Sequence, residues 1–360
     1  MERVSVIGAG PHGNLVAWKL AEKGFNVHVY EEHKETGVPV ACTGLLSDTI
    51  SKHIIVPKEA INGKINKARI HSPNYYVDLK IMPNTIVDRT KYDQHFQKMA
   101  EEQGAQYHHN TKFIGIKGKN LIFSESKNNT KTNILVGADG PNSTVAKQTG
   151  LFGNRKHLVG IQARVKGKYE NKIQFYPAIS TYAWIVPESK NTARIGVTGT
   201  GQVRKDFEAF MGQRMKNIIN YQAGPIPLHD PKINTQLITK NGPDTYLIGD
   251  AAAQIKNTTG GGLVPGLIAG NMLAESISKG RNYHKEWKKK LGRELKMHYL
   301  LRNALNRFSN EDYDTLIKTV KKPRVKQILA EESRDSPTKM LLKLAITAPD
   351  LLRFSPKVLA

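Results

Sequence analysis

The stretch RVSVIGAGPHGNLVAWKLAEKGFNVHVYE, residues 3–31, decides the fold. It opens with a short apolar run and passes through Gly8, Gly10 and Gly13. Apolar residues at helical spacing then continue up to Gly24, and a second apolar run closes the stretch. A buried strand, a helix that ends on a glycine and a second strand together predict a β-α-β unit.

The three glycines have the spacing G-x-G-x-x-G at the strand-to-helix turn. The first permits a tight turn, the second lets a pyrophosphate approach the backbone, and the third lets helix and strand pack closely. The start of the helix offers free N–H groups to the phosphates. Glu31 ends the second strand, 18 residues after Gly13, where an acid accepts hydrogen bonds from ribose hydroxyls. We therefore expect a dinucleotide-binding domain rather than a chance glycine turn.

The rest of the chain alternates between two textures. The two ends have an α/β texture, and the segment between them is rich in short strands. We expect an α/β protein with a doubly wound Rossmann-like dinucleotide-binding domain, an inserted β-sheet substrate domain and a helical C-terminal region. The expected domains are 1–62, 84–150 and 240–280 (discontinuous dinucleotide-binding domain), 63–83 and 151–239 (β-rich substrate domain) and 281–360 (basic helical region).

Three further stretches narrow the dinucleotide to FAD: VDRTKYDQHF with Arg89, GADGPNSTV with Asp139, and YLIGDAAAQIKNTTGGGL with Asp250, Gly260, Gly261 and Gly262. Their order and spacing resemble the p-hydroxybenzoate-hydroxylase-like flavoproteins. The resemblance implies that Arg89 and Asp250 lie along the pyrophosphate and ribityl chain, and that backbone amides of the three consecutive glycines reach the flavin ring. It implies that Asp139 supports the FAD fold and a transient nicotinamide donor.

One branch of that superfamily is a better match, over roughly residues 1 to 290. GVPVACTGLLS, residues 37–47, is similar to the G-x-P-x-x-C segment of the geranylgeranyl reductases, and YAWIVP, residues 182–187, resembles their Y-x-W-x-F-P signature. The chain departs from this signature in two ways. Val186 stands in place of Phe, and Pro177 precedes Tyr182 by five residues. These departures predict a wider or differently closed pocket.

The resemblance implies an FAD-dependent oxidoreductase that reduces isolated double bonds of polyprenyl chains, with a polyprenyl lipid or prenyl phosphate as substrate. Besides the residues above, the expected cofactor site includes Thr43 and Gly44, which follow Cys42, and Gly249, which precedes Asp250. The sequence leaves the electron donor open, and NAD(P)H and ferredoxin are the two candidates.

Three residues are candidates for the chemistry. Alternation places Tyr182 and Trp184 on one face of a strand, where they either stabilise a developing carbocation by cation–π attraction or simply pack the core of the sheet. Cys42 either donates a proton or contacts substrate, or is a small buried hydrophobe.

Composition excludes several classes of protein. With one cysteine, the chain alone forms no disulfide, no four-cysteine zinc site and no iron–sulfur cluster. It has no run of about 18 apolar residues and no signal-peptide pattern at its start, so we expect a cytoplasmic protein without a membrane-spanning helix and without a metal site.

The formal net charge of +23 predicts an anionic partner, which could be nucleic acid, anionic lipid or a phosphorylated small molecule. The region 256–360 has 21 Lys and Arg against 10 Asp and Glu. Its amphipathic stretches either cover a domain core or lie on an anionic membrane surface as a peripheral contact. Gly262, Gly266 and Gly270 are four apart, which we interpret as close helix packing beside FAD rather than as membrane-helix dimerisation.

Three rival functions remain. A flavin monooxygenase or halogenase has the same scaffold, but the halogenase pattern W-x-W-x-I-P requires Trp at 182 and Ile at 186, where this chain has Tyr and Val. An RNA-modifying flavoprotein would explain the charge, yet the sequence has no recognised RNA-binding module, so we do not expect nucleic acid. A quinone-reducing electron-transfer flavoprotein would need an iron–sulfur cluster that one cysteine cannot supply.

Overall fold

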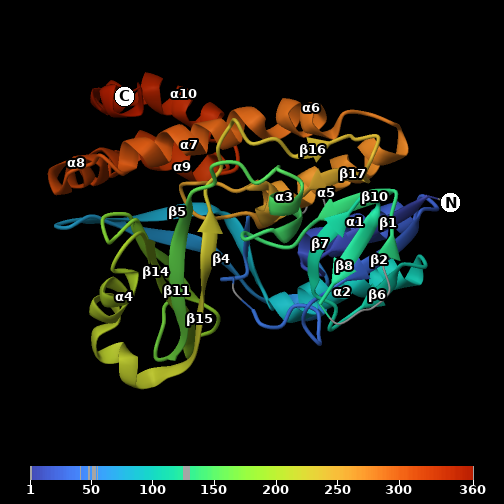
Figure 1. Ribbon diagram of the computed structural model, residues 1–360. Coiled ribbons are helices and arrows are strands. Elements are labelled where there is room, and N and C mark those ends of the chain that lie inside the picture. Colours follow the sequence, from blue (N-terminus) through green and yellow to red (C-terminus); the bar gives the residue numbers. More distant parts are fainter. Residues whose placement is uncertain are drawn as a thin grey trace.

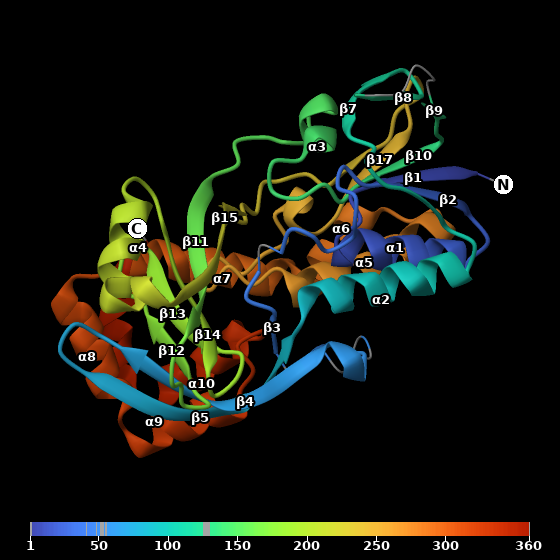
Figure 2. The same ribbon diagram turned by 90° about the horizontal axis from the view of Figure 1, so that it is seen from below.

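The computed structural model describes residues 2–40, 42–47, 49, 50, 54, 56–124 and 130–359. Two lobes lie side by side, each built around a β-sheet, and the C-terminal helices run across both (Figure 1). Figure 2 shows the long β4–β5 hairpin extending along the edge of the second lobe. The Rossmann-like FAD domain, inserted sheet and helical C-terminal region expected from the sequence are all present.

The first lobe contains a six-stranded sheet in the order β16-β17-β10-β1-β2-β6. All its pairings are parallel except that of β16 with β17. Its strands are β1 (Arg3–Ile7), β2 (Asn26–Tyr30), β6 (Gln106–His108), β10 (Ile134–Gly137), β16 (Gln236–Leu237) and β17 (Asp244–Leu247).

Different layers cover the two faces of this sheet. Val4, Val6 and Val136 pack against α1 (Pro11–Ala21) and α5 (Leu263–Ser278). Leu135 on the opposite face packs against α3 and a three-stranded sheet. These elements are α3 (Thr144–Gln148), β7 (Phe113–Lys117), β8 (Asn120–Phe123) and β9 (Thr130–Lys131), and α2 (Arg89–Glu102) lies beside α1.

The second lobe contains an eight-stranded sheet in the order β15-β11-β14-β13-β12-β4-β5-β3. Its pairings are antiparallel except that of β12 with β4. The strands are β3 (Leu45–Ser47), β4 (Ile61–His71), β5 (Tyr76–Val87), β11 (His157–Lys166), β12 (Ile173–Tyr176), β13 (Tyr182–Pro187), β14 (Thr192–Gly199) and β15 (Ile218–Pro227).

Strand β13 divides its side chains between the two faces of this sheet. Ala183 and Ile185 pack toward α4 (Val203–Met211). Tyr182 and Trp184 therefore lie on the opposite face, with ring centroids 5.8 Å apart. The sequence-based prediction that both rings share one face of a strand is confirmed.

The C-terminal helices lie on the β4–β5 hairpin and on α5. Val77 and Leu79 of β5 pack against Ile317 and Leu344 from two of these helices. Leu295 from another joins the helical layer of the first lobe. The helices are α6 (Tyr283–Trp287), a π-helical turn (Lys288–Gly292), α7 (Arg293–Leu305), α8 (Asn310–Val320), α9 (Pro323–Glu331), α10 (Pro337–Thr347) and α11 (Ser355–Leu359).

The structure adds strands that the sequence pattern did not predict. Strand β15 spans residues 218–227 and β3 spans residues 45–47. Strand β16 is short and comprises only Gln236 and Leu237. Strand β5 continues to Val87, and the domain boundaries given above remain a prediction.

Within the described part of the chain, none of the helices combines the length and the apolar character that crossing a membrane requires.

Two isoleucines of the C-terminal region test this packing. Ile317 is 1% exposed and Ile346 is 84% exposed. We expect Ile317→Ala to lower the free energy of unfolding by about 2–5 kcal/mol through loss of buried contacts. Ile346→Ala should change it by no more than about 0.5 kcal/mol. Urea denaturation of both variants checks this, and equal losses in the two would contradict the packing described.

Candidate active site

The glycine turn after β1 has the geometry that its motif predicts. Gly8 has φ +100°, and a Cβ there would lie 2.5 Å from the carbonyl oxygen of Ala138. A Cβ on Gly13 would overlap the carbonyl oxygen of Gly8. A Cβ on Gly10 would meet no atom within 4 Å. The first and third glycines are thus closed in by backbone, while the second faces open space where a phosphate group fits.

Glu31 lies at the same turn. Its carboxylate accepts hydrogen bonds from the backbone N–H of Ala9 at 2.8 Å and from that of His33 at 3.0 Å. The acid is therefore fixed at the end of β2 beside the glycine turn, as the sequence predicts.

His12 closes the gap between the glycine turn and α5, a role that the sequence reasoning missed. A Cβ on either Gly249 or Gly266 would overlap its imidazole ring, and its Nε2 lies 3.2 Å from the carbonyl oxygen of Leu263. Burial lowers the pKa of His12 to about 4, so the ring is neutral at physiological pH. Gly249 and Gly266 were visible in the sequence, but they are far from His12 in the chain. Only the fold shows that both glycines make room for its ring.

The glycines four apart on α5 pack against α1. Gly266 accommodates His12, and a Cβ on Gly270 would lie 3.1 Å from Leu15. The close helix packing predicted from the spacing is confirmed for Gly266 and Gly270, and its expected position beside FAD stays a prediction.

Arg89 starts α2 beside the glycine turn. Its Nε and Nη2 donate to the two carboxylate oxygens of Asp93 at 3.0 and 2.8 Å. Burial opposes the charged form, but the Asp93 carboxylate and Cys42 more than offset it, so the pKa of Arg89 lies above its ordinary value. A permanent positive charge thus lies next to Cys42 and acts on Asp250.

Asp250 and Asp139 both end strands but differ in their partners. Asp139 accepts from the Ser143 hydroxyl at 2.6 Å and from the N–H of Val145 at 3.0 Å, so it holds the start of α3 and supports the fold. The Asp250 carboxyl makes no hydrogen bond with other residues that the structure describes. Burial raises its pKa and Arg89 opposes the rise. A carboxyl in this setting suits a ligand hydroxyl as its donor.

The glycine loop 256–262 runs between Asp250 and the aromatic strand. A Cβ on Gly262 would lie 2.8 Å from the carboxylate of Asp250. A Cβ on Gly260 would lie 2.5 Å from the hydroxyl of Tyr182. The loop is therefore in contact with both the expected ribityl partner and the expected substrate wall, and side chains at these positions would separate them.

Gly261, the middle glycine of the three, closes the loop on itself. Its carbonyl accepts a hydrogen bond from the N–H of Lys256 at 3.2 Å, and a Cβ at this position would lie 2.9 Å from Cε of the same lysine. The structure thus gives Gly261 a role within the loop that the sequence did not predict. Its expected contact with the flavin ring, like that of Gly260 and Gly262, stays a prediction.

Arg302 of α7 holds this loop in place, and it too was missed from the sequence. The side chain is buried, with 2% exposed. It donates to the carbonyl oxygens of Asn257 at 3.1 Å and Thr258 at 2.8 Å, and across to Thr181 at 3.1 Å. Its guanidinium also lies 5.2 Å from the ring centroid of Tyr182.

Trp184 lies flat against the neighbouring strand. A Cβ on Gly196 of β14 would overlap its indole ring, so glycine at 196 makes room for it. The ring is half-buried, and its Nε1 makes no hydrogen bond within the described residues. Tyr182 beside it is 3% exposed, and burial raises the pKa of its phenol, which stays neutral.

Cys42 is held by the inserted sheet. Its Sγ accepts from the N–H of Gly44 at 3.3 Å, and its carbonyl accepts from Nη1 of Arg194 at 2.5 Å. Arg194 also donates to Gln222 at 2.9 Å. The Thr43 hydroxyl lies 3.4 Å from Oε1 of Gln162, which links the same segment to β11. Cys42 is half-buried, and the polar network around it was not foreseen.

A buried ion pair links the glycine loop to the C-terminal region. Lys256 at the start of the loop pairs with Asp335, which lies between α9 and α10. Their side chains are 7% and 14% exposed. Asp335 also accepts hydrogen bonds from Ser47 and Thr49. One carboxylate thus joins the glycine loop, strand β3 and the C-terminal helices.

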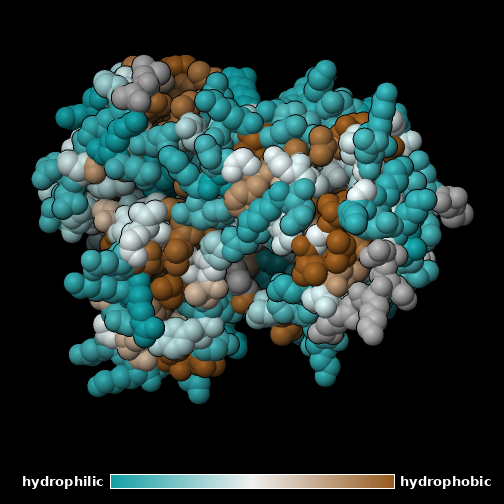
Figure 3. Space-filling view, viewed as in Figure 1, coloured by the Kyte–Doolittle hydropathy of each residue, from teal (hydrophilic) through white to brown (hydrophobic). Residues whose placement is uncertain are grey.

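The residues at this site fit FAD. Gly10 leaves room before the start of α1, Glu31 is fixed nearby, and Asp250 has an unpartnered carboxyl beside Gly262 among the residues described. Figure 3 shows a recess between the two lobes on the face it displays.

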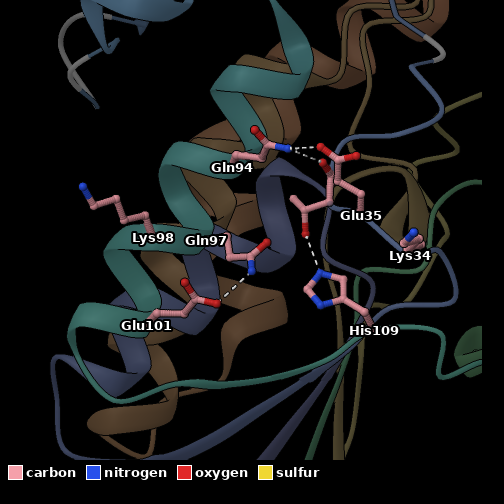
Figure 4. Close-up of a pocket in the computed structure, with 8 residues that line it drawn as sticks. Lys34, Glu35, Gln94, Gln97, Lys98, Glu101 and His109 are labelled. Carbon is pink, nitrogen blue, oxygen red and sulfur yellow. Dashed lines mark hydrogen bonds between the residues drawn. The ribbon is translucent and has the colours of Figure 1, made fainter.

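A separate hollow of about 380 Å³ lies on α2 and the loop after β2. Figure 4 shows its side chains bonded to one another, with Gln94 donating to Glu35 at 2.7 Å and Gln97 to Glu101 at 2.8 Å. None of its lining residues belongs to the site around Cys42 and Tyr182. This hollow is therefore separate from the candidate site.

Comparison with known proteins identifies the family. Residues 6–43 match the family model described as an NAD(P)-binding Rossmann-like domain. The chain is 30% identical to digeranylgeranylglycerophospholipid reductase 3 of Methanosphaera stadtmanae over 95% of both proteins. It belongs to the digeranylgeranylglycerophospholipid reductase family.

Solved structures extend the match. A geranylgeranyl bacteriochlorophyll reductase-like protein of Thermoplasma acidophilum has a TM-score of 0.85 at 22% identity, over 99% of this chain and 100% of that one. The flavin-dependent brominase Bmp2 has a TM-score of 0.69 at 16% identity, over 98% and 99%. These two likenesses concern the fold. As a member of the reductase family, the protein is an FAD-dependent oxidoreductase.

The first test of the site compares two glycines. Gly13→Ala should weaken both folding and FAD binding, because its Cβ overlaps backbone. Gly10→Ala should leave the thermal unfolding of the FAD-free protein unchanged, since φ there is −73° and its Cβ meets no protein atom. It should weaken FAD binding about tenfold or more, about 1.4 kcal/mol. Flavin fluorescence titration and circular dichroism measure the two effects, and unchanged FAD affinity in Gly10→Ala would argue against the pyrophosphate position.

The second test concerns pH. His229 is 2% exposed and its Nδ1 lies 3.0 Å from the carbonyl oxygen of Ala253. Burial lowers the pKa of His229 to about 4, against 6.5 for the free side chain. Between these values the unfolded chain binds more protons, so stability falls as the pH drops from about 7 toward 4, by up to about 3 kcal/mol from this residue.

His229→Gln should flatten this dependence relative to the parent, whereas His95→Gln, a change at a partly exposed histidine, should not. Urea denaturation at pH 7 and pH 5 provides the measurement. Equal pH slopes for the parent and His229→Gln would show that His229 is not buried in its neutral form.

Proposed function

We propose that the protein reduces isolated carbon–carbon double bonds in the geranylgeranyl chains of isoprenoid or archaeal-type membrane lipids. The observation that carries the proposal is the contact between the Tyr182 hydroxyl and the position of Gly260. It brings the aromatic strand of the inserted sheet against the glycine loop expected at the flavin. The name of the Methanosphaera stadtmanae relative, a digeranylgeranylglycerophospholipid reductase, supports the same substrate class.

The cofactor is assigned to residues of the first lobe. Gly8, Gly10 and Gly13 with the start of α1 hold the pyrophosphate, and Glu31 accepts hydrogen bonds from the ribose hydroxyls. Arg89 and Asp250 lie along the pyrophosphate and ribityl chain. Reduced FAD, when bound, supplies a hydride from N5. The remaining assigned positions are Thr43, Gly44, Asp139, Gly249, Gly260, Gly261 and Gly262.

The double bond requires a proton as well as a hydride. An isolated trisubstituted alkene acquires carbocation character at its more substituted carbon while the proton arrives at the other. Cys42 is the proposed proton donor or substrate contact. Arg194 holds its carbonyl and Gly44 N–H holds its sulfur, so the thiol has a defined place at the lobe interface.

Trp184 is the better candidate to stabilise the developing cation. The guanidinium of Arg302 already lies 5.2 Å from the Tyr182 ring, and it adds a positive charge that repels a cation on that side. Trp184 is half-buried and has no cation at its ring among the contacts described. We therefore assign Tyr182 to the wall of the substrate site against Gly260 and Trp184 to the reacting carbon.

The proposed location follows from the substrate. A prenyl lipid lies in a bilayer, so we propose that this protein works in the cytoplasm, as a peripheral protein at the inner face of the membrane. Its basic surface suits an anionic lipid layer. NAD(P)H and ferredoxin remain the two candidate electron donors, and nucleic acid is not an expected partner.

The decisive experiment is mass spectrometry of lipids after anaerobic incubation with dithionite-reduced protein. We expect geranylgeranyl glycerophospholipids dispersed in detergent to gain hydrogens in pairs. If none of the geranylgeranyl substrates gains a hydrogen pair, the proposal is wrong. Oxygen-dependent hydroxylation or halogenation instead would favour the monooxygenase alternative.

A pair of variants tests the aromatic assignment in the same assay. Trp184→Leu should lower turnover roughly 2- to 30-fold, the equivalent of one cation–π contact, with FAD retained. Phe210→Leu is the matched control because Phe210 packs with Tyr176 in the cluster that includes α4, away from Trp184. Equal turnover in Trp184→Leu and the control would remove Trp184 from the chemistry.

A further inference from the structure

Helix α10 exposes an apolar stripe that the fold does not use. Leu342 is 59% exposed and Ile346 is 84% exposed. The two are four residues apart, so they lie on one face of the helix, one turn above the other. Leu352, in the turn that follows, is 52% exposed. We call these three residues the α10 stripe.

The opposite face of α10 packs against the core. Leu344 is 7% exposed and Ala348 is 1% exposed, and both belong to the cluster with Val77 and Leu79 of β5. The helix is therefore anchored without the stripe. A single exposed leucine is ordinary on a protein surface, but three large exposed apolar side chains on an already anchored helix and in the turn after it suggest a second contact.

Cations alternate with the stripe. Lys339 and Lys343 lie on the same exposed side of α10, and Arg353 follows Leu352. Both lysines pair with Glu332 at 3.1 and 2.5 Å, yet their side chains remain 66% and 45% exposed. The surrounding region 256–360 has 21 Lys and Arg against 10 Asp and Glu. Apolar residues flanked by lysines are typical of helices that lie in the interface of an anionic bilayer.

We propose that the α10 stripe docks the protein on an anionic lipid surface, with Leu342, Ile346 and Leu352 entering the acyl boundary and the flanking cations meeting lipid phosphates. Figure 3 shows hydrophobic residues gathered beside the C-terminal end of the chain, where Figure 1 labels α10. The proposal rests on the proposed function in one respect, namely that the substrate resides in a bilayer.

The docking helix is close in the chain to the site. Asp335, which pairs with Lys256 of the glycine loop, lies two residues before Pro337, where α10 begins. The helix that contacts lipid therefore starts beside an anchor of the loop expected at the flavin. If α10 lies on a bilayer, the ion pair of Asp335 with Lys256 connects that contact to the glycine loop, which a lipid tail has to reach.

A second copy of the chain is a less suitable partner for the α10 stripe than a lipid surface. Two stripes face to face would also bring together Lys339, Lys343 and Arg353 of each copy, and like charges repel. Three side chains cover far less than the about 800 Å² per partner of a standard stable interface. An anionic lipid layer, by contrast, complements both the apolar and the positive parts of the surface.

The test is sedimentation of the full-length FAD-loaded protein with vesicles of phosphatidylglycerol or of phosphatidylcholine. The parent should bind phosphatidylglycerol vesicles and release them as salt rises. The double variant Leu342→Glu with Ile346→Glu should bind at least about tenfold more weakly, because two of the three side chains that enter the acyl boundary are lost. Ile238→Glu is the matched control, because Ile238 is 57% exposed on the first lobe, and it should bind like the parent.

The proposal is overturned by equal vesicle binding of the parent and the double variant, or by a parent that binds no vesicle, whether or not it forms dimers through the stripe. A second assay, the reduction of detergent-dispersed lipid, distinguishes failure of the docking proposal from failure of the proposed function. A parent that reduces lipid in detergent without binding vesicles refutes only the docking surface. A parent that binds through the stripe and reduces nothing refutes only the proposed function.

Discussion

One buried guanidinium connects the three parts of this protein. Arg302 of the C-terminal region donates to the carbonyl oxygens of Asn257 and Thr258 in the glycine loop and to Thr181 at the start of the aromatic strand. Carbonyls in a loop have no partners of their own, and a buried one without a donor is costly. The loop can therefore keep its glycine-rich, side-chain-free surface because a helix from another part of the chain supplies its donors. Loss of Arg302 would leave these carbonyls unpaired and free the loop from Tyr182.

Local sequence predicts the first lobe well and the second lobe less well. The β-α-β unit of residues 3–31 is continuous in the chain, so apolar periodicity and glycine spacing contain most of the information that specifies it. Strand β15, residues 218–227, is different because β11 is its only partner among the strands that the structure describes, and because it is mostly exposed or half-buried. Gly224, Pro225 and Pro227 interrupt its apolar residues, and glycine and proline disfavour the interior of a strand. The tertiary partner, and not the segment's own residues, makes it a strand.

The same division holds within the site. Gly8, Gly13 and Glu31 were predicted because the glycine spacing and the acid after the second strand are signals within one β-α-β unit. His12 and Arg194 were not predicted, because each contacts segments far away in sequence. His12 meets one glycine after β17 and one on α5, and Arg194 donates to the carbonyl of Cys42. A histidine or an arginine alone has no spacing signal. What identified them is which backbone each one meets, and that requires the fold.

The aromatic pair that the sequence grouped together is divided by its surroundings. Tyr182 contacts the glycine loop through its hydroxyl and Arg302 through its ring, so its position is set by parts of the protein itself. Trp184 is fixed by shape, because Gly196 leaves the space in which the indole lies, and its N–H has no partner in the described part of the chain. Trp184 is half-buried, and the described contacts place no cation at its ring. A cation is attracted to an aromatic face and repelled by a guanidinium. An isoprenoid cation would therefore be less favoured beside Tyr182, where Arg302 lies, than beside Trp184.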